Sequence, residues 1–234
     1  MCGIVGYVGT RKSIPILLEG LERLEYRGYD SSGVAVQHDG TMTVCKAKGK
    51  VSALQSLDLP SAVPGPGIGH TRWATHGEPS DANAHPHVDG RGRIAVVHNG
   101  IIENASIIRE RLEGQGVVFS SDTDSEVLPH LIAAADTDDL ADAVRQALAV
   151  VEGTYGIAVL DSRDPGCVVV ARNGSPVVIG VGNGENFIAS DPAAIVRYTQ
   201  QAIFLEDGDM AVVRADAFQT FRLDSTETTK RAET

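Results

Sequence analysis

Short apolar runs bounded by turn-forming residues recur along almost the whole chain, and this pattern restricts the fold more than any other feature. Runs of about 4–8 residues rich in β-branched and aromatic side chains are typical of strands. Helical periodicity appears in separate blocks between groups of these runs, whereas a doubly wound parallel sheet would alternate strands and helices. We therefore predict an α+β fold built in layers, although the periodicity alone does not determine how the sheets stack.

The predicted strands and helices fill residues 1–222, which we expect to form one domain. Strands are predicted at residues 3–9, 33–37, 42–46, 67–76, 93–98, 155–161, 167–171, 176–181, 186–189, 202–204, 210–214 and 218–222. Helices are predicted at residues 13–26, with Ser13 as N-cap, and at 105–113, 124–135, 140–152 and 192–200. Residues 223–234 lack hydrophobic periodicity and are predicted to be a linker or chain end.

Composition argues against several functional classes. The formal net charge is −11 and no cluster of basic residues offsets it, so we expect no nucleic-acid partner. The longest apolar stretches are too short to cross a bilayer and no leader precedes Cys2, so we expect neither secretion nor membrane insertion. The three cysteines (Cys2, Cys45 and Cys167) form no CxxC motif, which favours a reducing compartment over a disulfide framework or a zinc site. We therefore expect a cytoplasmic protein.

Cys2 allows two interpretations. As a small apolar residue it could simply begin the buried strand at residues 3–9. Alternatively, removal of Met1 would leave a free α-amine on the same residue as the thiol. Such an amine has a pKa of about 8, so part of it is neutral at cellular pH and can accept the thiol proton directly or through a water. Gly3 would leave room for other groups beside the reacting atom.

Two further motifs contain groups that acyl-transfer chemistry needs. The motif HTRWATHG places Arg72 among hydroxyl groups, and a guanidinium matches the two oxygens of an α-carboxylate. The alternative is an edge arginine in a strand beside a core tryptophan. At Asn99-Gly100 the side-chain amide and the glycine N–H could together donate to one oxyanion, although Asn-Gly alone is usually a turn.

Asp124 precedes a predicted helix and also has two interpretations. Thr123 and Glu126 have the spacing of a capping box, in which Asp124 would only interact favourably with the helix dipole. In the other hypothesis Asp124 faces a ligand and pairs with an ammonium group. One residue can have both roles.

Taken together, these motifs resemble those of the class II glutamine amidotransferases, a family with an N-terminal cysteine nucleophile. Four of them match that family in order and spacing: CGIVG at 2–6, HTRWATHG at 70–77, HNG at 98–100 and SDTDSE at 121–126. Three more are similar to the glucosamine-6-phosphate synthase group within it: LEYRGYDSSG at 24–33, NAHPH at 83–87 and NFIASD at 186–191. The likeness covers residues 2–222.

The resemblance implies a fold and a set of roles. The fold would be a four-layer αββα N-terminal-nucleophile hydrolase sandwich. Cys2 would be the nucleophile, its α-amine the general base, and Asn99 with Gly100 the oxyanion hole. The substrate-binding residues would be Arg72 and Thr75 at the α-carboxylate, Asp124 at the α-amine, and Trp73 and His76 around the pocket. Arg27 would support the amine of the nucleophile.

The activity implied is hydrolysis of L-glutamine to L-glutamate and ammonia through a thioester on Cys2. A C-terminal sugar-phosphate isomerase region, which the 234 residues do not contain, would use the ammonia for amino-sugar synthesis from fructose-6-phosphate. No cofactor and no metal are expected; His85 and His87 are predicted to form loop or interdomain hydrogen bonds instead. A binding or regulatory module without turnover, and a glutaminase serving another acceptor, remain alternatives, and a homodimer is left open.

Overall fold

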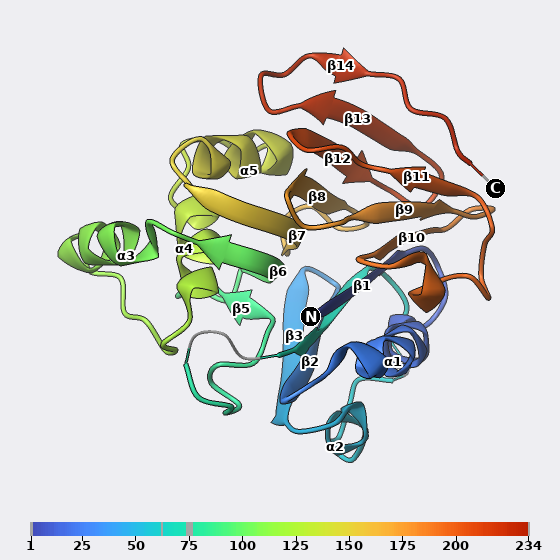
Figure 1. Cartoon of the computed structure of the whole chain (residues 1–234), viewed down its shortest axis with the longest axis horizontal. Helices are drawn as coiled ribbons and strands as arrows, with labels where there is room; N and C mark the ends of the chain where they lie inside the picture. The colour runs from blue at the N-terminus through green and yellow to red at the C-terminus, as the bar shows by residue number, and fades with distance from the viewer. Residues whose placement is uncertain (1, 62, 74–76, 234) are drawn as a thin grey trace.

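Two antiparallel sheets form the centre of the molecule (Figure 1). The structure is a computed structural model that describes residues 2–61, 63–73 and 77–233. The first sheet has the order β11-β9-β10-β1-β4-β2-β3, with bounds β11 Ala202–Phe204, β9 Val178–Val181, β10 Asn186–Ala189, β1 Gly3–Val8, β4 Gly67–Arg72, β2 Ser31–His38 and β3 Thr41–Lys48. The second has the order β14-β13-β12-β8-β7-β6-β5, with bounds β14 Glu227–Thr228, β13 Phe218–Arg222, β12 Asp209–Val213, β8 Val168–Asn173, β7 Gly153–Asp161, β6 Ile94–Ile102 and β5 His87–Val88.

The helices pack against the outer faces of the two sheets. The α-helices are α1 Ser13–Leu24, α2 Val51–Gln55, α3 Ala105–Gly114, α4 Val127–Ala133 and α5 Leu140–Leu148. Three short 3₁₀ helices are η1 Glu25–Arg27, η2 Asp124–Glu126 and η3 Pro192–Ala194. None of the helices in the described ranges is long and apolar enough to span a bilayer.

Strand alternation divides the core into three apolar layers. In β1, Ile4 faces the second sheet, whereas the next residue, Val5, packs against α1 and its neighbours. In β6, Ala95 lies between the sheets and Val96 packs against the helices α3 to α5. Helices, sheet, sheet and helices therefore form four layers, which confirms the predicted αββα sandwich. Because β1 and β6 are buried on both faces, the residues at their ends are held on rigid elements.

Several local predictions differ from the observed elements. The predicted helix at 192–200 is only η3, because Asp191 caps a single turn and Thr199 bonds back to the carbonyl of Val181 in β9. Helix α1 begins as predicted, but Lys12 occupies the N-cap position and Ser13 is buried. Strand β6 continues through Asn99 to Ile102, beyond the predicted end. The elements α2, β5 and β14 were not predicted.

The chain end, predicted as a linker, runs along the sheets instead of leaving them. Strand β14 pairs with β13, and Glu233 forms a bridge with Ala202 at the edge of the first sheet. The ammonium of Lys230 lies 2.6 Å from the carboxylate of Asp209, which is fully buried. Residues 223–233 therefore stay mostly exposed, as a linker would, but are bonded to both sheets.

Candidate active site

Cys2 directly precedes β1, the central strand of the first sheet, and its thiol contacts Trp73 after the neighbouring strand β4. The Cys2 Sγ accepts a hydrogen bond from the Trp73 N–H at 3.2 Å and lies 3.6 Å from the Trp73 carbonyl oxygen. Burial raises the pKa of the Cys2 thiol, although the bond from Trp73 and the charge of Arg72 act in the opposite direction. A nearby base is therefore needed to form the thiolate at neutral pH.

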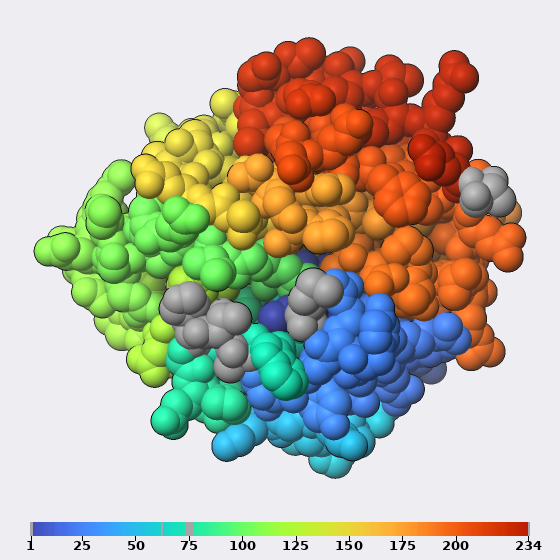
Figure 2. Space-filling view, in the orientation of Figure 1, coloured from blue at the N-terminus to red at the C-terminus, as the bar shows by residue number. Residues whose placement is uncertain are grey.

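A small cavity of about 30 Å³ adjoins the thiol. Its lining includes Cys2, Arg72 and Asp124, which come from the start of β1, the end of β4 and the start of η2. One thiol, one cation and one carboxylate, far apart in the sequence, therefore meet around one space. Figure 2 shows the beginning of the chain, in dark blue, at the bottom of a hollow on this face. The cavity has room for about one water molecule, so a larger ligand requires side chains at its mouth to move.

Arg72 is buried and held by its own surroundings. One terminal nitrogen lies 3.8 Å from the Asp30 carboxylate, and the other donates to the carbonyl of Gly77 at 3.1 Å. The alternative interpretation of Arg72 as an edge arginine is not supported by this position, because β4 lies between β1 and β2.

Asp124 is fixed by its backbone neighbours. Its Oδ2 accepts from the N–H of Ile102 at 2.7 Å, whereas within the described residues Oδ1 has only a 3.3 Å contact with the Ser125 hydroxyl. That hydroxyl lies closer, at 2.7 Å, to Nδ1 of His98. Since Nε2 of His98 donates to a main-chain carbonyl, Nδ1 accepts the hydrogen bond from the Ser125 hydroxyl. One oxygen of Asp124 therefore retains capacity for another donor.

The capping box that the spacing of Thr123 and Glu126 suggested does not form. The Thr123 side chain caps neither backbone N–H of the following turn and instead contacts Nε2 of His87. The Glu126 carboxylate turns back to the preceding loop, where it accepts from the N–H and hydroxyl groups of Ser120 and Ser121.

Asn99 and Gly100 lie on β6 of the opposite sheet, facing the start of β1. The Nδ2 of Asn99 donates to the Cys2 carbonyl at 3.3 Å, and its Oδ1 lies 2.9 Å from Nε2 of His70. Gly100 has a φ of 132°, and a Cβ placed there would lie 2.1 Å from the carbonyl oxygen of Thr154. Only glycine fits this position without moving the backbone.

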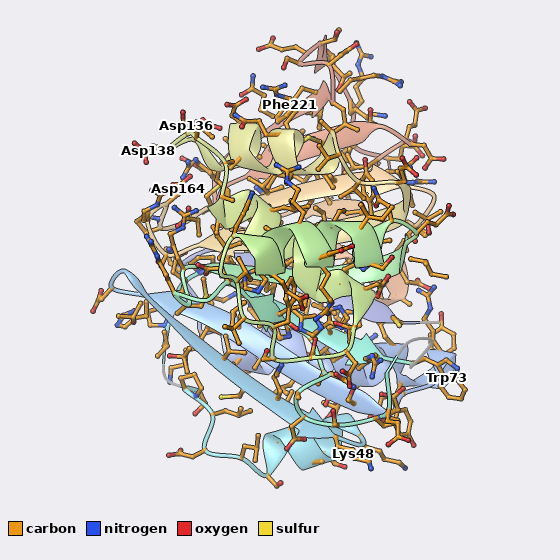
Figure 3. All side chains as sticks on the ribbon, turned by 90° about the vertical axis from the view of Figure 1, so that its left-hand side faces the viewer. Lys48, Trp73, Asp136, Asp138, Asp164 and Phe221 are labelled. Carbon is orange, nitrogen blue, oxygen red and sulfur yellow. The ribbon has the colours of Figure 1, made fainter. Side chains whose placement is uncertain are left out.

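Of the remaining predicted residues, Trp73 lines the cavity and Arg27 does not, whereas Thr75 and His76 are outside the described residues. Trp73 is 54% exposed and lies at the edge of the molecule (Figure 3). Its indole covers Gly28, whose φ is 96°. The guanidinium of Arg27 lies 3.6 Å from the carboxylate of Asp191, which also accepts from the Tyr26 hydroxyl at 2.8 Å.

Gly28→Ala is expected to displace the indole of Trp73, since the added Cβ would lie 2.3 Å from Cε3 of that ring. The unusual backbone conformation adds a cost of about 1–3 kcal/mol. Trp73 is the only tryptophan, so intrinsic fluorescence reports its surroundings, and a thermal melt reports stability. Gly40→Ala is the matched control, because Gly40 also has positive φ but open space around it. Unchanged emission in Gly28→Ala beside a normal melt would contradict this packing.

A buried group of histidines lies behind the cavity, and the sequence patterns did not indicate it. The rings of His70 and His85 are 4.1 Å apart, and those of His85 and His87 are 4.5 Å apart. Burial lowers the pKa of His70 to about 3 and the pKa values of His85, His87 and His98 below their usual range, so all four are neutral at pH 7. In residues 2–61, 63–73 and 77–233 no three metal-ligating side chains are arranged to hold an ion. The position of His70 and His98 within predicted apolar strands was the one sequence feature that could have indicated their burial.

The predicted hydrogen bonds of the two loop histidines are confirmed in part. His87 contacts Thr123 through Nε2 at 2.9 Å. For His85, neither ring nitrogen has a hydrogen-bond partner among the described residues.

Comparison with known proteins agrees with the predicted fold and family. The family described as "Glutamine amidotransferase domain" matches residues 70–197, more than half of the chain. The glutamine--fructose-6-phosphate aminotransferase [isomerizing] of Chlorobaculum tepidum is 55% identical over 99% of this chain and 39% of that protein. The enzyme of the same name from Symbiobacterium thermophilum is 55% identical over 90% of this chain and 35% of that protein. The chain thus spans well under half the length of these relatives.

A solved structure also agrees with the predicted fold. The glutamine phosphoribosylpyrophosphate amidotransferase from B. subtilis has a TM-score of 0.82 and 27% identity, over 95% of this chain and 49% of that one. With a matched family, an αββα sandwich and a thiol at the start of its central strand, the chain belongs to the glutamine amidotransferase domain family.

Proposed function

We propose that this domain hydrolyses L-glutamine to L-glutamate and ammonia through a thioester on Cys2. The observation that supports it best is the cavity that joins the Cys2 thiol to one cation and one carboxylate. A free amino acid has one anionic and one cationic end, so its recognition requires this pair of charges. A binding module without turnover would need the charges but would have no use for the thiol.

The proposed reaction has two halves. The Cys2 thiolate attacks the side-chain carbonyl carbon of glutamine, the C–N bond breaks, and the nitrogen leaves as ammonia after taking up a proton. Water then attacks the thioester, which releases glutamate and restores the thiol. The Asn99 amide and the Gly100 N–H stabilise the oxyanion of each tetrahedral intermediate. The base is the α-amine of Cys2, which becomes free when Met1 is removed.

Substrate recognition is assigned to the charges at the cavity. Arg72, together with Thr75, binds the α-carboxylate, and the available Oδ1 of Asp124 accepts from the α-ammonium. Trp73 and His76 are also assigned to substrate binding, and Arg27 supports the site from η1, where it pairs with Asp191.

The relatives support a proposal for the acceptor of the ammonia. Their name, glutamine--fructose-6-phosphate aminotransferase [isomerizing], and the small share of their length that this chain spans support an isomerase region as the partner. We propose that it uses the ammonia to convert fructose-6-phosphate to glucosamine-6-phosphate. All three cysteines are free, which fits the cytoplasm.

A glutamine-like diazo ketone is expected to alkylate Cys2 and neither Cys45 nor Cys167. Cys167 is buried and its pKa is raised to about 12, mainly by burial, so it is a poor nucleophile. Mass spectrometry of protease digests locates the adduct, and a glutaminase assay follows the loss of activity. Protein that retains Met1 is the control and should be inactive. Full glutaminase activity without any adduct on Cys2 would overturn the proposal.

A further inference from the structure

His70 lies in β4 of the first sheet, but its ring bonds to β6 of the second sheet. The Nε2 of His70 lies 2.9 Å from the Oδ1 of Asn99 and 3.1 Å from the main-chain carbonyl oxygen of His98. The residue is completely buried and its ring packs against His85. A single ring nitrogen thus contacts two oxygens on the strand that carries the proposed oxyanion hole.

The carbonyl of His98 determines which nitrogen of His70 carries the hydrogen. A main-chain carbonyl can only accept, so Nε2 must donate, and the ring is the neutral Nε2–H tautomer. Nothing in the described part of the chain bonds to Nδ1, so no contact there favours the other tautomer. Since burial lowers the pKa of His70 to about 3, this state persists throughout the physiological pH range.

The fixed Nε2–H in turn determines the orientation of the Asn99 carboxamide. An N–H donor at 2.9 Å requires the oxygen of the amide, not its NH₂ group, on the His70 side. The NH₂ group is then directed to the other side, where Nδ2 donates to the Cys2 carbonyl at 3.3 Å. If the carboxamide were flipped, its NH₂ group would face the Nε2–H of His70, so two donors would oppose each other. Its oxygen, an acceptor, would then face Cys2.

We propose that His70 is a positioning residue that holds the Asn99 amide with its N–H groups toward the substrate oxygen that becomes the oxyanion. This inference rests on the proposed glutaminase function. It predicts that loss of the His70 donor weakens stabilisation of the oxyanion while leaving glutamine binding unchanged. Preorganised donors are effective because they need no reorientation during the reaction.

His70→Leu is expected to lower kcat by about 10- to 100-fold with little change in KM, less than the roughly 10²–10³-fold loss on removing the Asn99 donor itself. His70→Gln, whose Nε2 can donate from a similar reach, should recover most of the activity. In an Asn99→Ala background, His70→Leu should cause little further loss, because residues that act through one interaction are not additive. A loss that multiplies fully with that of Asn99→Ala would overturn the inference.

A tetrahedral adduct provides a second readout. The γ-aldehyde of glutamate forms a hemithioacetal with a thiol, and its oxygen occupies the proposed oxyanion position, whereas glutamate does not form this adduct. His70→Leu should weaken aldehyde inhibition by the factor by which kcat falls and leave glutamate inhibition unchanged. Equal weakening of both inhibitors would reject the positioning role.

The failure of this inference is distinguishable from failure of the proposed function. If the processed wild type and Asn99→Ala behave as proposed but folded His70→Leu keeps the wild-type kcat, only the inference fails. If processed wild type has no more glutaminase activity than Cys2→Ala, the proposed function fails, and the inference fails with it.

If His70→Leu does not fold, His70→Gln decides. A folded His70→Gln variant with wild-type KM and a kcat near that of the wild type supports the inference. A folded His70→Gln variant with a kcat as low as that of Asn99→Ala overturns it.

Discussion

Cys2→Ala is expected to abolish glutamate release from the processed domain while the fold persists. The thiolate is the only group that attacks glutamine itself in the proposed reaction, and neither Cys45 nor Cys167 lines the cavity. Cys2→Ser should be strongly impaired, since a hydroxyl is much harder to deprotonate than a thiol. A coupled assay for glutamate measures the loss, and circular dichroism with a thermal melt checks the fold.

Cys45→Ala is the matched control for the loss of a thiol. Cys45 lies on β3, away from the cavity, and its pKa is raised by burial, so its removal should leave turnover near that of the wild type. Turnover by Cys2→Ala close to that of Cys45→Ala would refute Cys2 as the nucleophile.

Asp124→Asn is expected to raise KM for glutamine far more than it lowers kcat. Truncating one partner of a desolvated charge pair costs about 2–5 kcal/mol, or roughly 30- to several-thousand-fold in affinity. Asparagine retains the shape and an oxygen for the Ile102 N–H, so the change removes mainly the charge. Steady-state kinetics and a thermal melt on the same samples measure the two effects separately.

Glu126→Gln is the comparison variant for Asp124→Asn. The Glu126 carboxylate lies two residues from Asp124 but accepts hydrogen bonds from the loop that precedes it. Burial acts to raise the pKa of Glu126, but the imidazole of His130, 3.8 Å away, and hydrogen bonds from the serines at 120 and 121 lower this pKa well below its usual range. The charged form is therefore stabilised by folding, and this contribution is lost as pH falls toward the native pKa. Glu126→Gln should lower the melting temperature and spare KM. An unchanged KM in Asp124→Asn with a lowered melting temperature would instead assign Asp124 a purely structural role.

The success of the strand predictions has a local physical cause. Side chains alternate along β1 and β6, so neighbouring residues pack into different apolar layers. Adjacent residues such as Ile4 and Val5 are therefore both apolar, and the sequence shows this directly. The helix expected at 192–200 is only one capped turn, although Ala194 and Ile195 are buried in the core beside α1, because Asp191 caps that turn and Thr199 bonds to β9 instead of extending a helix. Glu126 matched a capping box in spacing, but the serines before it offered more donors.

For the candidate site too, some features could be predicted from the sequence and others could not. The motifs around Cys2, Arg72, Asn99 and Asp124 were recognisable in the sequence because their residue types are restricted by chemistry and by close backbone approach, as at Gly100. Their convergence on one cavity, and the bond from His70 to Asn99, were decided only by the tertiary structure. These contacts cross from one sheet to the other, and their geometry depends on how both buried faces pack, which no local periodicity encodes.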